Sequence, residues 1–311
     1  MTTIAGEPIH VVCATDEQYA MPLCACLASA IHFLDPTIEL HVSLLDAGIQ
    51  DKTKTKLRRS LEALARGRLE LTFVDISDAR EIRSYSASQH VNWVTLSKLM
   101  LPRLLPNTRK AIWLDCDLIV CDSLLELWQT PMQGKSILAV RESTVGRNLP
   151  FSEDYGVALD APYFNSGVMV LDLDSLRRND LTSRALTFLA RHPRLNYLDQ
   201  DVLNIVGADD WAQLDPRWNF IVAHHPEIMA SIEQAHLRPH PSIVHYASVP
   251  KPWHWNYGYQ RLYSSYFYYA LDLTEWRGWR PPIGARQVIR SRWPTLATSL
   301  RRLRERVNRL L

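Results

Sequence analysis

Short apolar runs alternate with amphipathic segments through the first two thirds of the chain. The pattern predicts buried strands at 9–14, 39–45, 69–74, 110–114 and 164–173. It predicts helices at 20–34, 51–65 and 96–105. In the second of these helices Leu57, Leu61 and Leu64 share one face. Because helices of this length between strands form βαβ units, we expect an α/β fold with a mainly parallel central sheet.

Composition narrows the class of protein. With 311 residues, 47% of them hydrophobic and a net charge of +2, the chain is too apolar to be disordered. It contains no apolar run of the roughly 18–20 residues that a membrane-spanning helix needs, and residues 1–7 do not resemble a secretory signal. The five cysteines are odd in number and lack zinc-site spacing, so we expect reduced thiols and a cytoplasmic protein.

The charge is unevenly distributed. Residues 284–311 contain eight Arg and one Glu, whereas the rest of the chain contains 27 basic and 32 acidic side chains. Apolar residues recur in this basic tail at helical spacing: Leu296, Leu300, Leu303, Val307, Leu310 and Leu311. A basic amphipathic helix is typical of binding to an anionic membrane surface. The alternatives are a helix packed on the body and a contact with nucleic acid.

The sharpest local feature is a buried strand that ends in two carboxylates, Asp115 and Asp117. Open α/β sheets bind ligands at the carboxyl ends of their strands. Two acids buried there are costly unless a cation pairs with them, and their hard oxygens suit Mg²⁺ or Mn²⁺, which in turn hold phosphates. The alternative is a loop with incidental acids that caps a helix beginning near Ser123.

Three further motifs carry polar groups next to predicted strands or helices. Asn-Ser-Gly at 165–167 offers an amide, a hydroxyl and close backbone approach, although it also suits a plain turn. Asp-Gln-Asp at 199–201 precedes a helical pattern, where it could be a cap with two first-turn acids. His245 follows an apolar strand, and Lys251 lies six residues later. They would serve as a third metal ligand and a phosphate clamp, or the histidine is purely structural.

In this order the four motifs resemble glycosyltransferase family 8, the retaining enzymes that use nucleotide-sugar donors. Within it the chain is most similar to the bacterial lipopolysaccharide and lipooligosaccharide α-galactosyltransferases. The resemblance runs from about residue 9 to 280 and implies a GT-A fold, a Rossmann-like sheet with a small helical, basic C-terminal extension. The predicted domains are a transferase domain at 1–252, an aromatic-rich subdomain at 253–283 and a membrane-associating tail at 284–311.

The resemblance assigns the metal and nucleotide contacts. Asp115, Asp117 and His245 match the metal ligands, with Mn²⁺ as the usual ion and Mg²⁺ as the alternative. The loop after the first strand would hold uracil and ribose through Ala14, Asp16 and Tyr19. Cys116, between the two acids, and Ser248 belong to the same donor site. Ser248 stands where the family has Gly, and Ser166 stands where Ala is commoner.

The resemblance also assigns the sugar and diphosphate contacts. Lys98 would reach the diphosphate and the sugar, unless it is a solvated helix charge. Asn165, Asp199 and Gln200 would line the donor sugar, and Lys251 would contact the β-phosphate. The candidate catalytic residues are therefore Gln200, Asp199 and Lys251. Because an amide oxygen is a weak nucleophile, Gln200 favours same-face attack, in which the leaving phosphate oxygen accepts the acceptor's proton.

The expected reaction transfers galactose or glucose from a UDP-sugar to an oligosaccharide or lipid-linked saccharide at the inner face of the membrane. The expected acceptor is a lipopolysaccharide or lipooligosaccharide core. We expect no nucleic-acid partner. Of the 27 residues from 253 to 279, 11 are aromatic, which suits either an acceptor platform or packing of a helical subdomain. Two rival functions are a haloacid-dehalogenase-like phosphohydrolase, whose Asp-x-Asp would open the fold and continue into Gly-Thr, and a nucleotide-sugar-binding scaffold without catalysis.

Overall fold

The computed structural model describes residues 7–85, 93–142, 161–193, 195, 197–224, 240–254 and 263–282. Its strands are β1 (Ile9–Thr15), β2 (Leu40–Asp46), β3 (Leu69–Asp75), β4 (Lys110–Leu114), β5 (Leu118–Val120), β6 (Ile137–Arg141), β7 (Phe164–Asp172), β8 (Trp211–Gln213), β9 (Phe220–Ile221) and β10 (Ile243–His245). Its α-helices are α1 (Ala20–His32), α2 (Asp51–Ala65), α3 (Arg80–Arg83), α4 (Leu101–Leu104), α5 (Leu124–Gln129), α6 (Leu173–Arg178), α7 (Leu181–Arg191), α8 (Leu198–Val206) and α10 (Ser264–Asp272). Short 3₁₀ segments are η1 (Trp93–Met100), η3 (Pro216–Asn219) and η4 (Val222–His224).

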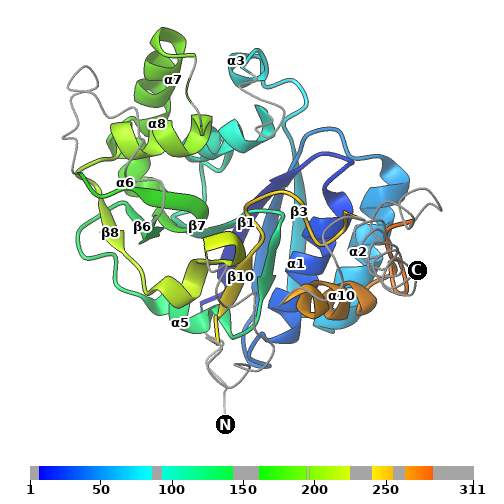
Figure 1. The fold of residues 1–311 in the computed structure, drawn as a ribbon. Coiled ribbons are helices and arrows are strands. Elements are labelled where there is room, and N and C mark those ends of the chain that lie inside the picture. The colour runs from blue at the N-terminus through cyan, green and yellow to red at the C-terminus, as the bar shows by residue number, and fades with distance from the viewer. Residues whose placement is uncertain are drawn as a thin grey trace, which may run out of the picture.

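The main sheet has the order β3-β2-β1-β4-β7-β6-β8 (Figure 1). Neighbouring strands are parallel except where β7 runs antiparallel to both β4 and β6. The expectation of a mainly parallel α/β sheet is therefore confirmed. The chain moves outward from β1 through β2 to β3 and then returns to the other side of β1 with β4. Such a reversal leaves a crevice at the carboxyl ends of the two central strands.

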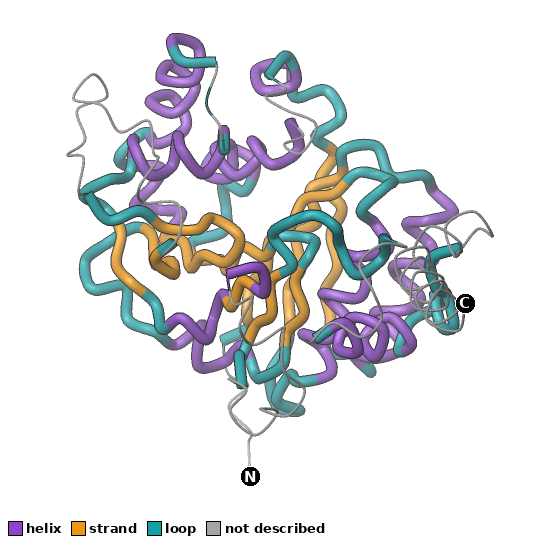
Figure 2. The backbone as a smooth tube through the Cα atoms, viewed as in Figure 1, coloured by secondary structure: helices purple, strands orange, loops and turns teal. Residues whose placement is uncertain are grey.

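Helices cover both faces of this sheet, as the tube in Figure 2 makes visible. Along β1, Val11 and Cys13 face a core shared with α1 and α2, whereas Val12 and Ala14 face a second core built by η1 and α6 to α8. Successive side chains of a strand point to opposite faces, so this alternation is what a sheet buried on both sides requires.

The segment predicted as one helix at 96–105 differs in the structure. It consists of the 3₁₀ segment η1 followed by the single-turn helix α4. Pro102 explains the difference, because proline has no N–H to donate and its ring clashes with the carbonyl four residues earlier, at Lys98. The tighter 3₁₀ winding places Lys98 on the buried side of the segment.

A small second sheet, β5-β10-β9, joins the main body to the C-terminal helix α10. Phe267, Tyr268 and Leu271 of α10 are buried against Val244 and other residues of this sheet. For the described part of the aromatic segment, packing against the body is therefore the observed role. The division of the chain at residue 252 stays a prediction, and the basic tail at 284–311 lies outside the described residues.

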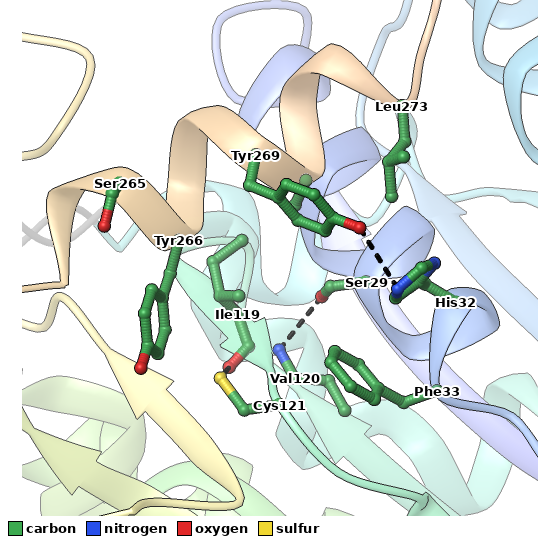
Figure 3. Close-up of a pocket in the computed structure, with 11 residues that line it drawn as sticks. Ser29, His32, Phe33, Ile119, Val120, Cys121, Ser265, Tyr266, Tyr269 and Leu273 are labelled. Atoms are coloured by element: carbon green, nitrogen blue, oxygen red, sulfur yellow. Dashed lines mark hydrogen bonds between the residues drawn. The ribbon is translucent and has the colours of Figure 1, made fainter.

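Two tyrosines of α10 remain exposed despite this packing. Tyr266 and Tyr269 line an apolar pocket of about 420 Å³ between α10, β5 and the end of α1 (Figure 3). The Tyr269 hydroxyl lies 3.3 Å from His32 Nε2 across the pocket, and the Ser29 hydroxyl accepts the Val120 N–H at 2.9 Å.

None of the described helices combines the length and the apolar character that crossing a bilayer requires.

Candidate functional site

The candidate site lies where four strands of the main sheet end at one edge. β1, β4 and β6 point their carboxyl ends to this edge, and antiparallel β7 brings its amino end there. A cleft of about 950 Å³ opens at this place. All thirteen residues that the sequence assigned to the site line it: Ala14, Asp16, Tyr19, Lys98, Asp115, Cys116, Asp117, Asn165, Asp199, Gln200, His245, Ser248 and Lys251. Their individual roles in binding and catalysis stay predictions.

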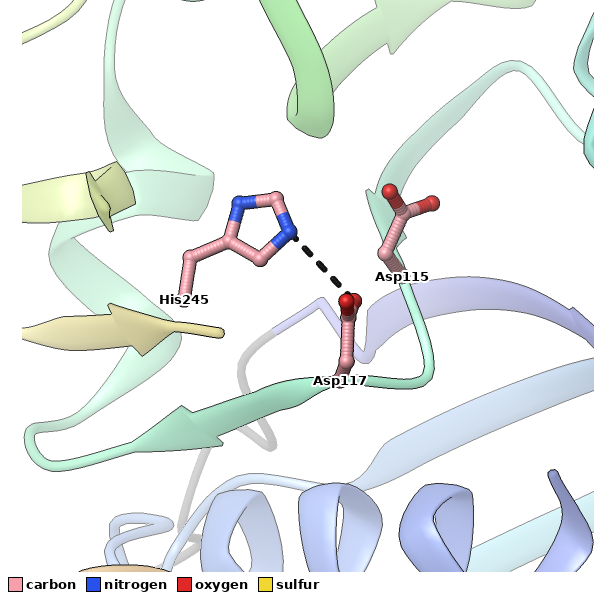
Figure 4. A group of neighbouring side chains, drawn as sticks. All are labelled: Asp115, Asp117 and His245. Carbon is pink, nitrogen blue, oxygen red and sulfur yellow. Dashed lines mark ion pairs between the residues drawn. The ribbon is translucent and has the colours of Figure 1, made fainter. Parts of the chain in front are cut away.

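Asp115, Asp117 and His245 form the centre of the cleft (Figure 4). The two acids follow β4, and His245 ends β10, whose antiparallel pairing with β5 carries the histidine back beside Asp117. One possible ligand atom from each of the three lies within 4.8 Å of the others. The helix α5 is capped by Ser123, whose hydroxyl accepts the Leu125 N–H, so helix capping does not explain the two acids.

The donor set fits a divalent cation. The two carboxylates suit hard ions such as Mg²⁺ and Mn²⁺, and the imidazole is a ligand that transition-metal ions accept. His245 Nε2 lies 3.3 Å from Asp117 Oδ1, so a nitrogen lone pair and a carboxylate oxygen converge on the same space. A cation bound between them would satisfy both groups, and Lys251 already neutralises Asp117 from the other side at 2.5 Å.

Opposite pKa shifts distinguish the two acids. Burial raises the pKa of Asp115 above its ordinary value, since the neighbouring Lys98 offsets this effect only in part and Asp117 adds to it. Burial also acts on Asp117, but the charges of Lys251 and His245 outweigh it and hold the pKa of Asp117 well below its ordinary value. Asp117 is therefore the acid that is firmly ionised without a metal, whereas Asp115 gains most from a cation placed beside it.

Lys98 is a buried hub of the site. Its side chain is 2% exposed, and its ammonium lies 3.0 Å from Asp115 and 2.8 Å from Asp199. It also donates to the Ser166 hydroxyl at 3.1 Å. Burial would lower the pKa of Lys98, but the two carboxylates raise it above its ordinary value. The alternative of a solvated helix charge is wrong, because the buried Lys98 ammonium links Asp115 to the 199–201 motif.

The 199–201 motif divides into three separate contacts at the start of α8. Asp199 pairs with Lys98 and accepts from the Ser166 hydroxyl at 3.0 Å. Gln200 Oε1 accepts the Ser166 N–H at 3.0 Å, which fixes the amide at the cleft wall. Asp201 is fully buried and accepts the Tyr197 N–H at 2.8 Å. The N-cap residue of α8 is Tyr197, so the motif lies in the first turn of the helix, where Asp201 reaches back to the chain before it and the other two side chains reach the cleft.

The loop after β1 forms the opposite wall. Asp16 accepts the N–H of Tyr19 at 3.1 Å, which fixes the turn that leads into α1. Cys116 donates its thiol to the Ala14 carbonyl at 2.8 Å and so closes this loop onto the Asp-x-Asp turn. Ser248 lies exposed at the rim. All five cysteines are free thiols, as expected, although Cys116 and Cys121 are only partly buried.

Several residues of the site were missed from the sequence. Glu142 follows β6 directly, lines the cleft and lies 3.3 Å from both His224 and Asn165. Glu142 comes two residues after the buried apolar run 137–140, with the exposed Arg141 between them, so the signal is a weaker form of the one that identified Asp115. Asn219 Oδ1 accepts a hydrogen bond from His245 Nδ1 at 2.8 Å, and no local pattern marked this residue.

Comparisons with known proteins agree with this geometry. General stress protein A of Bacillus subtilis (strain 168) is 26% identical over 281 residues, which cover 87% of the chain and 95% of that protein. Glycosyltransferase GlyF of Streptococcus pneumoniae serotype 4 (strain ATCC BAA-334 / TIGR4) is 26% identical over 271 residues, and the match spans 85% of the chain but 62% of GlyF.

Among solved structures, the galactosyltransferase LgtC in complex with donor and acceptor sugar analogues superposes with a TM-score of 0.74 at 24% identity. The superposition covers 86% of this chain and 96% of LgtC, and it confirms the GT-A fold expected from the sequence. The family model for glycosyl transferase family 8 matches residues 10–256. The chain is a member of glycosyl transferase family 8.

Proposed function

We propose that the protein is a retaining hexosyltransferase that moves galactose or glucose from a UDP-sugar to a saccharide acceptor with the help of a divalent cation. The observation that carries this proposal is the convergence of Asp115, Asp117, His245 and Lys251 in one cleft at the sheet's reversal point. Two acids, an imidazole and an ammonium form a site for a cation together with a diphosphate, and a family 8 transferase needs such a site for its donor.

The chemistry of the leaving group explains the arrangement. Breaking the bond between sugar and phosphate leaves negative charge on UDP, and preorganised positive groups lower the energy of that transition state. When bound, Mn²⁺ supplies such a charge, with Mg²⁺ as the alternative ion. Lys251 is anchored to Asp117 Oδ2 and the Tyr246 carbonyl, both at 2.5 Å, so its ammonium needs little reorganisation to face the leaving phosphate.

Retention of configuration needs attack on the face that the diphosphate leaves, or a covalent intermediate. Gln200 is a poor nucleophile, and its amide is held by the Ser166 N–H and by Tyr163. Asp199 is engaged by Lys98 and Ser166. We therefore assign both residues to positioning the donor sugar, and the acceptor hydroxyl attacks from the same face while its proton passes to the leaving phosphate oxygen.

The acceptor and the location are also part of the proposal. The superposed protein is named a galactosyltransferase, and the sequence resemblance extends to lipopolysaccharide and lipooligosaccharide enzymes. A saccharide of this class, soluble or lipid-linked, is the proposed acceptor. The basic tail at 284–311 would hold the enzyme at the anionic inner face of the membrane, where a lipid-linked acceptor is presented.

The test is UDP release from a panel of UDP-sugars, measured with Mn²⁺, with Mg²⁺ and with EDTA. We expect UDP-galactose or UDP-glucose to turn over, EDTA to abolish turnover and Mn²⁺ to restore it. D78A, which changes an exposed acid that does not line the cleft, is the matched control for D117A. Full activity in EDTA would refute the metal role, and phosphatase activity without any UDP-sugar turnover would favour the phosphohydrolase.

A further inference from the structure

A chain of hydrogen bonds runs from the backbone of β7 to the imidazole of His245. The Gly167 N–H donates to Asn165 Oδ1 at 2.9 Å, and Asn165 Nδ2 donates to Glu142 Oε2 at 3.3 Å. A backbone N–H can only donate and a carboxylate oxygen accepts. The two contacts therefore fix which end of the Asn165 amide is oxygen and which is nitrogen.

The orientation of Asn165 determines that of Asn219. Asn219 Nδ2 lies 2.8 Å from Asn165 Oδ1, so it donates to this oxygen, which Gly167 already marks as an acceptor. The remaining atom of the Asn219 amide, Oδ1, lies 2.8 Å from His245 Nδ1. An amide oxygen has no proton to give, so His245 must carry its proton on Nδ1.

The consequence concerns the other ring nitrogen. With the proton held on Nδ1, Nε2 is the ring nitrogen that faces Asp117 Oδ1, 3.3 Å away, and the one whose lone pair a cation would bind. We infer that Asn219 is a positioning residue that selects the metal-binding tautomer of His245. This inference rests on the divalent cation proposed above, because the Nε2 lone pair matters only if a cation is to be bound.

The fold explains how Asn219 comes to this position. It ends the 3₁₀ segment η3, whose start is capped by Asp215, and it is buried. The next residues form β9, which pairs in parallel with β10, so that Ile221 lies opposite His245. Strand pairing therefore holds Asn219 beside the imidazole, and partners that orient a ligating histidine commonly change metal affinity by about 10–100-fold.

The test measures Mn²⁺ affinity of the full chain by calorimetry, without substrate. We expect N219A to bind Mn²⁺ about 10–100-fold more weakly than the wild type. N219D keeps an oxygen that accepts the Nδ1 proton but loses the donor to Asn165, so it should regain most of the affinity. S60A, which removes a buried hydroxyl bonded to two backbone groups far from the cleft, is the matched control and should bind normally.

A second measurement on the wild type does not depend on how the variants fold. Long-range ¹H–¹⁵N NMR of the metal-free chain at pH 8.5, with His245 assigned through its loss in H245Q, should show the Nδ1–H form. A ring with its proton on Nε2 and none on Nδ1 would overturn the inference, and so would equal affinity of N219A and the wild type. If the wild type itself does not bind Mn²⁺, the metal proposal fails instead, and the NMR result still decides the tautomer.

Discussion

Replacing Gly167 with alanine tests how closely the backbone of β7 must approach His245, the proposed metal ligand. A Cβ added at Gly167 would lie 2.4 Å from His245 Cε1 and 2.9 Å from both His245 Nδ1 and Asn165 Oδ1. Ordinary contact for such atoms begins near 3.4 Å, so the imidazole would have to retreat by about 1 Å, the difference between the two distances. The φ angle of Gly167 lies outside the left-handed region, so a side chain there meets no backbone strain and the expected cost is steric.

The magnitude follows from this displacement. Overpacking a buried site by one methyl group costs about 1–3 kcal/mol of unfolding free energy. A 1 Å misplacement of a catalytic group can slow a reaction by about 100-fold. We therefore expect G167A to remain folded, with a measurable loss of stability, weaker Mn²⁺ binding and UDP release slowed by about 100-fold. Urea denaturation, calorimetry and the donor-hydrolysis assay measure these three effects.

A double-mutant cycle identifies the cause of the stability loss. In the H245A background the ring that meets the new methyl group is absent, so G167A should cost much less there than in the wild type. The coupling between the two positions should account for most of the cost of G167A. An equal loss of stability in both backgrounds would refute the argument, because it would place the clash at Asn165 or elsewhere in the strand.

Four further predictions concern the reaction and the tail. D115A, D117A and H245A should each lower turnover by at least about 100-fold, measured as UDP release with saturating Mn²⁺. K251A should raise the barrier to transfer by about 2–4 kcal/mol, and an effect on acceptor affinity alone would place this lysine elsewhere. An α-linked donor should give an α-linked product by NMR, and a β-linked product would contradict retention. Deleting 284–311 should abolish binding to anionic liposomes at matched salt but spare transfer to soluble acceptors, and unchanged liposome binding would exclude the tail as anchor.

The strand pattern predicted much of the fold because the central strand β1 is buried and apolar almost throughout, whereas the edge strand β3 alternates apolar and polar residues. β1, β2 and β3 lie within one residue of their expected ends. The position of the cleft was also predictable, since Asp115 and Asp117 break an apolar run where a strand must end. The exception is the segment 96–105, because hydrophobic spacing cannot distinguish a 3₁₀ segment from an α-helix over so few residues. Pro102 was nevertheless a sign that the regular α-helical hydrogen bonds would be interrupted.

The residues that orient the ligands could not be predicted in the same way. Asn219 acts through Asn165 and His245, which are 54 and 26 positions away in the chain. Its neighbours Trp218 and Phe220 form an apolar context in which an asparagine carries no sign of its partners. Such a role is fixed by strand pairing between β9 and β10, and pairing between distant segments is not readable from one sequence.

The Asp-Gln-Asp motif shows why even a recognised motif leaves the roles of its members open. Successive residues of a helix are separated by about 100° around its axis, so three adjacent polar side chains cannot all face one cleft. Asp199 and Gln200 reach Ser166 and the donor cleft, whereas Asp201 turns back to the Tyr197 N–H and accepts the Tyr163 hydroxyl at 2.7 Å. The helix start could have been placed one residue earlier or later without changing the sequence pattern. The packing of α8 against β7 sets the rotation of this helix about its axis. That rotation decides that Asp199 lines the cleft, whereas Asp201 turns back to Tyr197 and Tyr163.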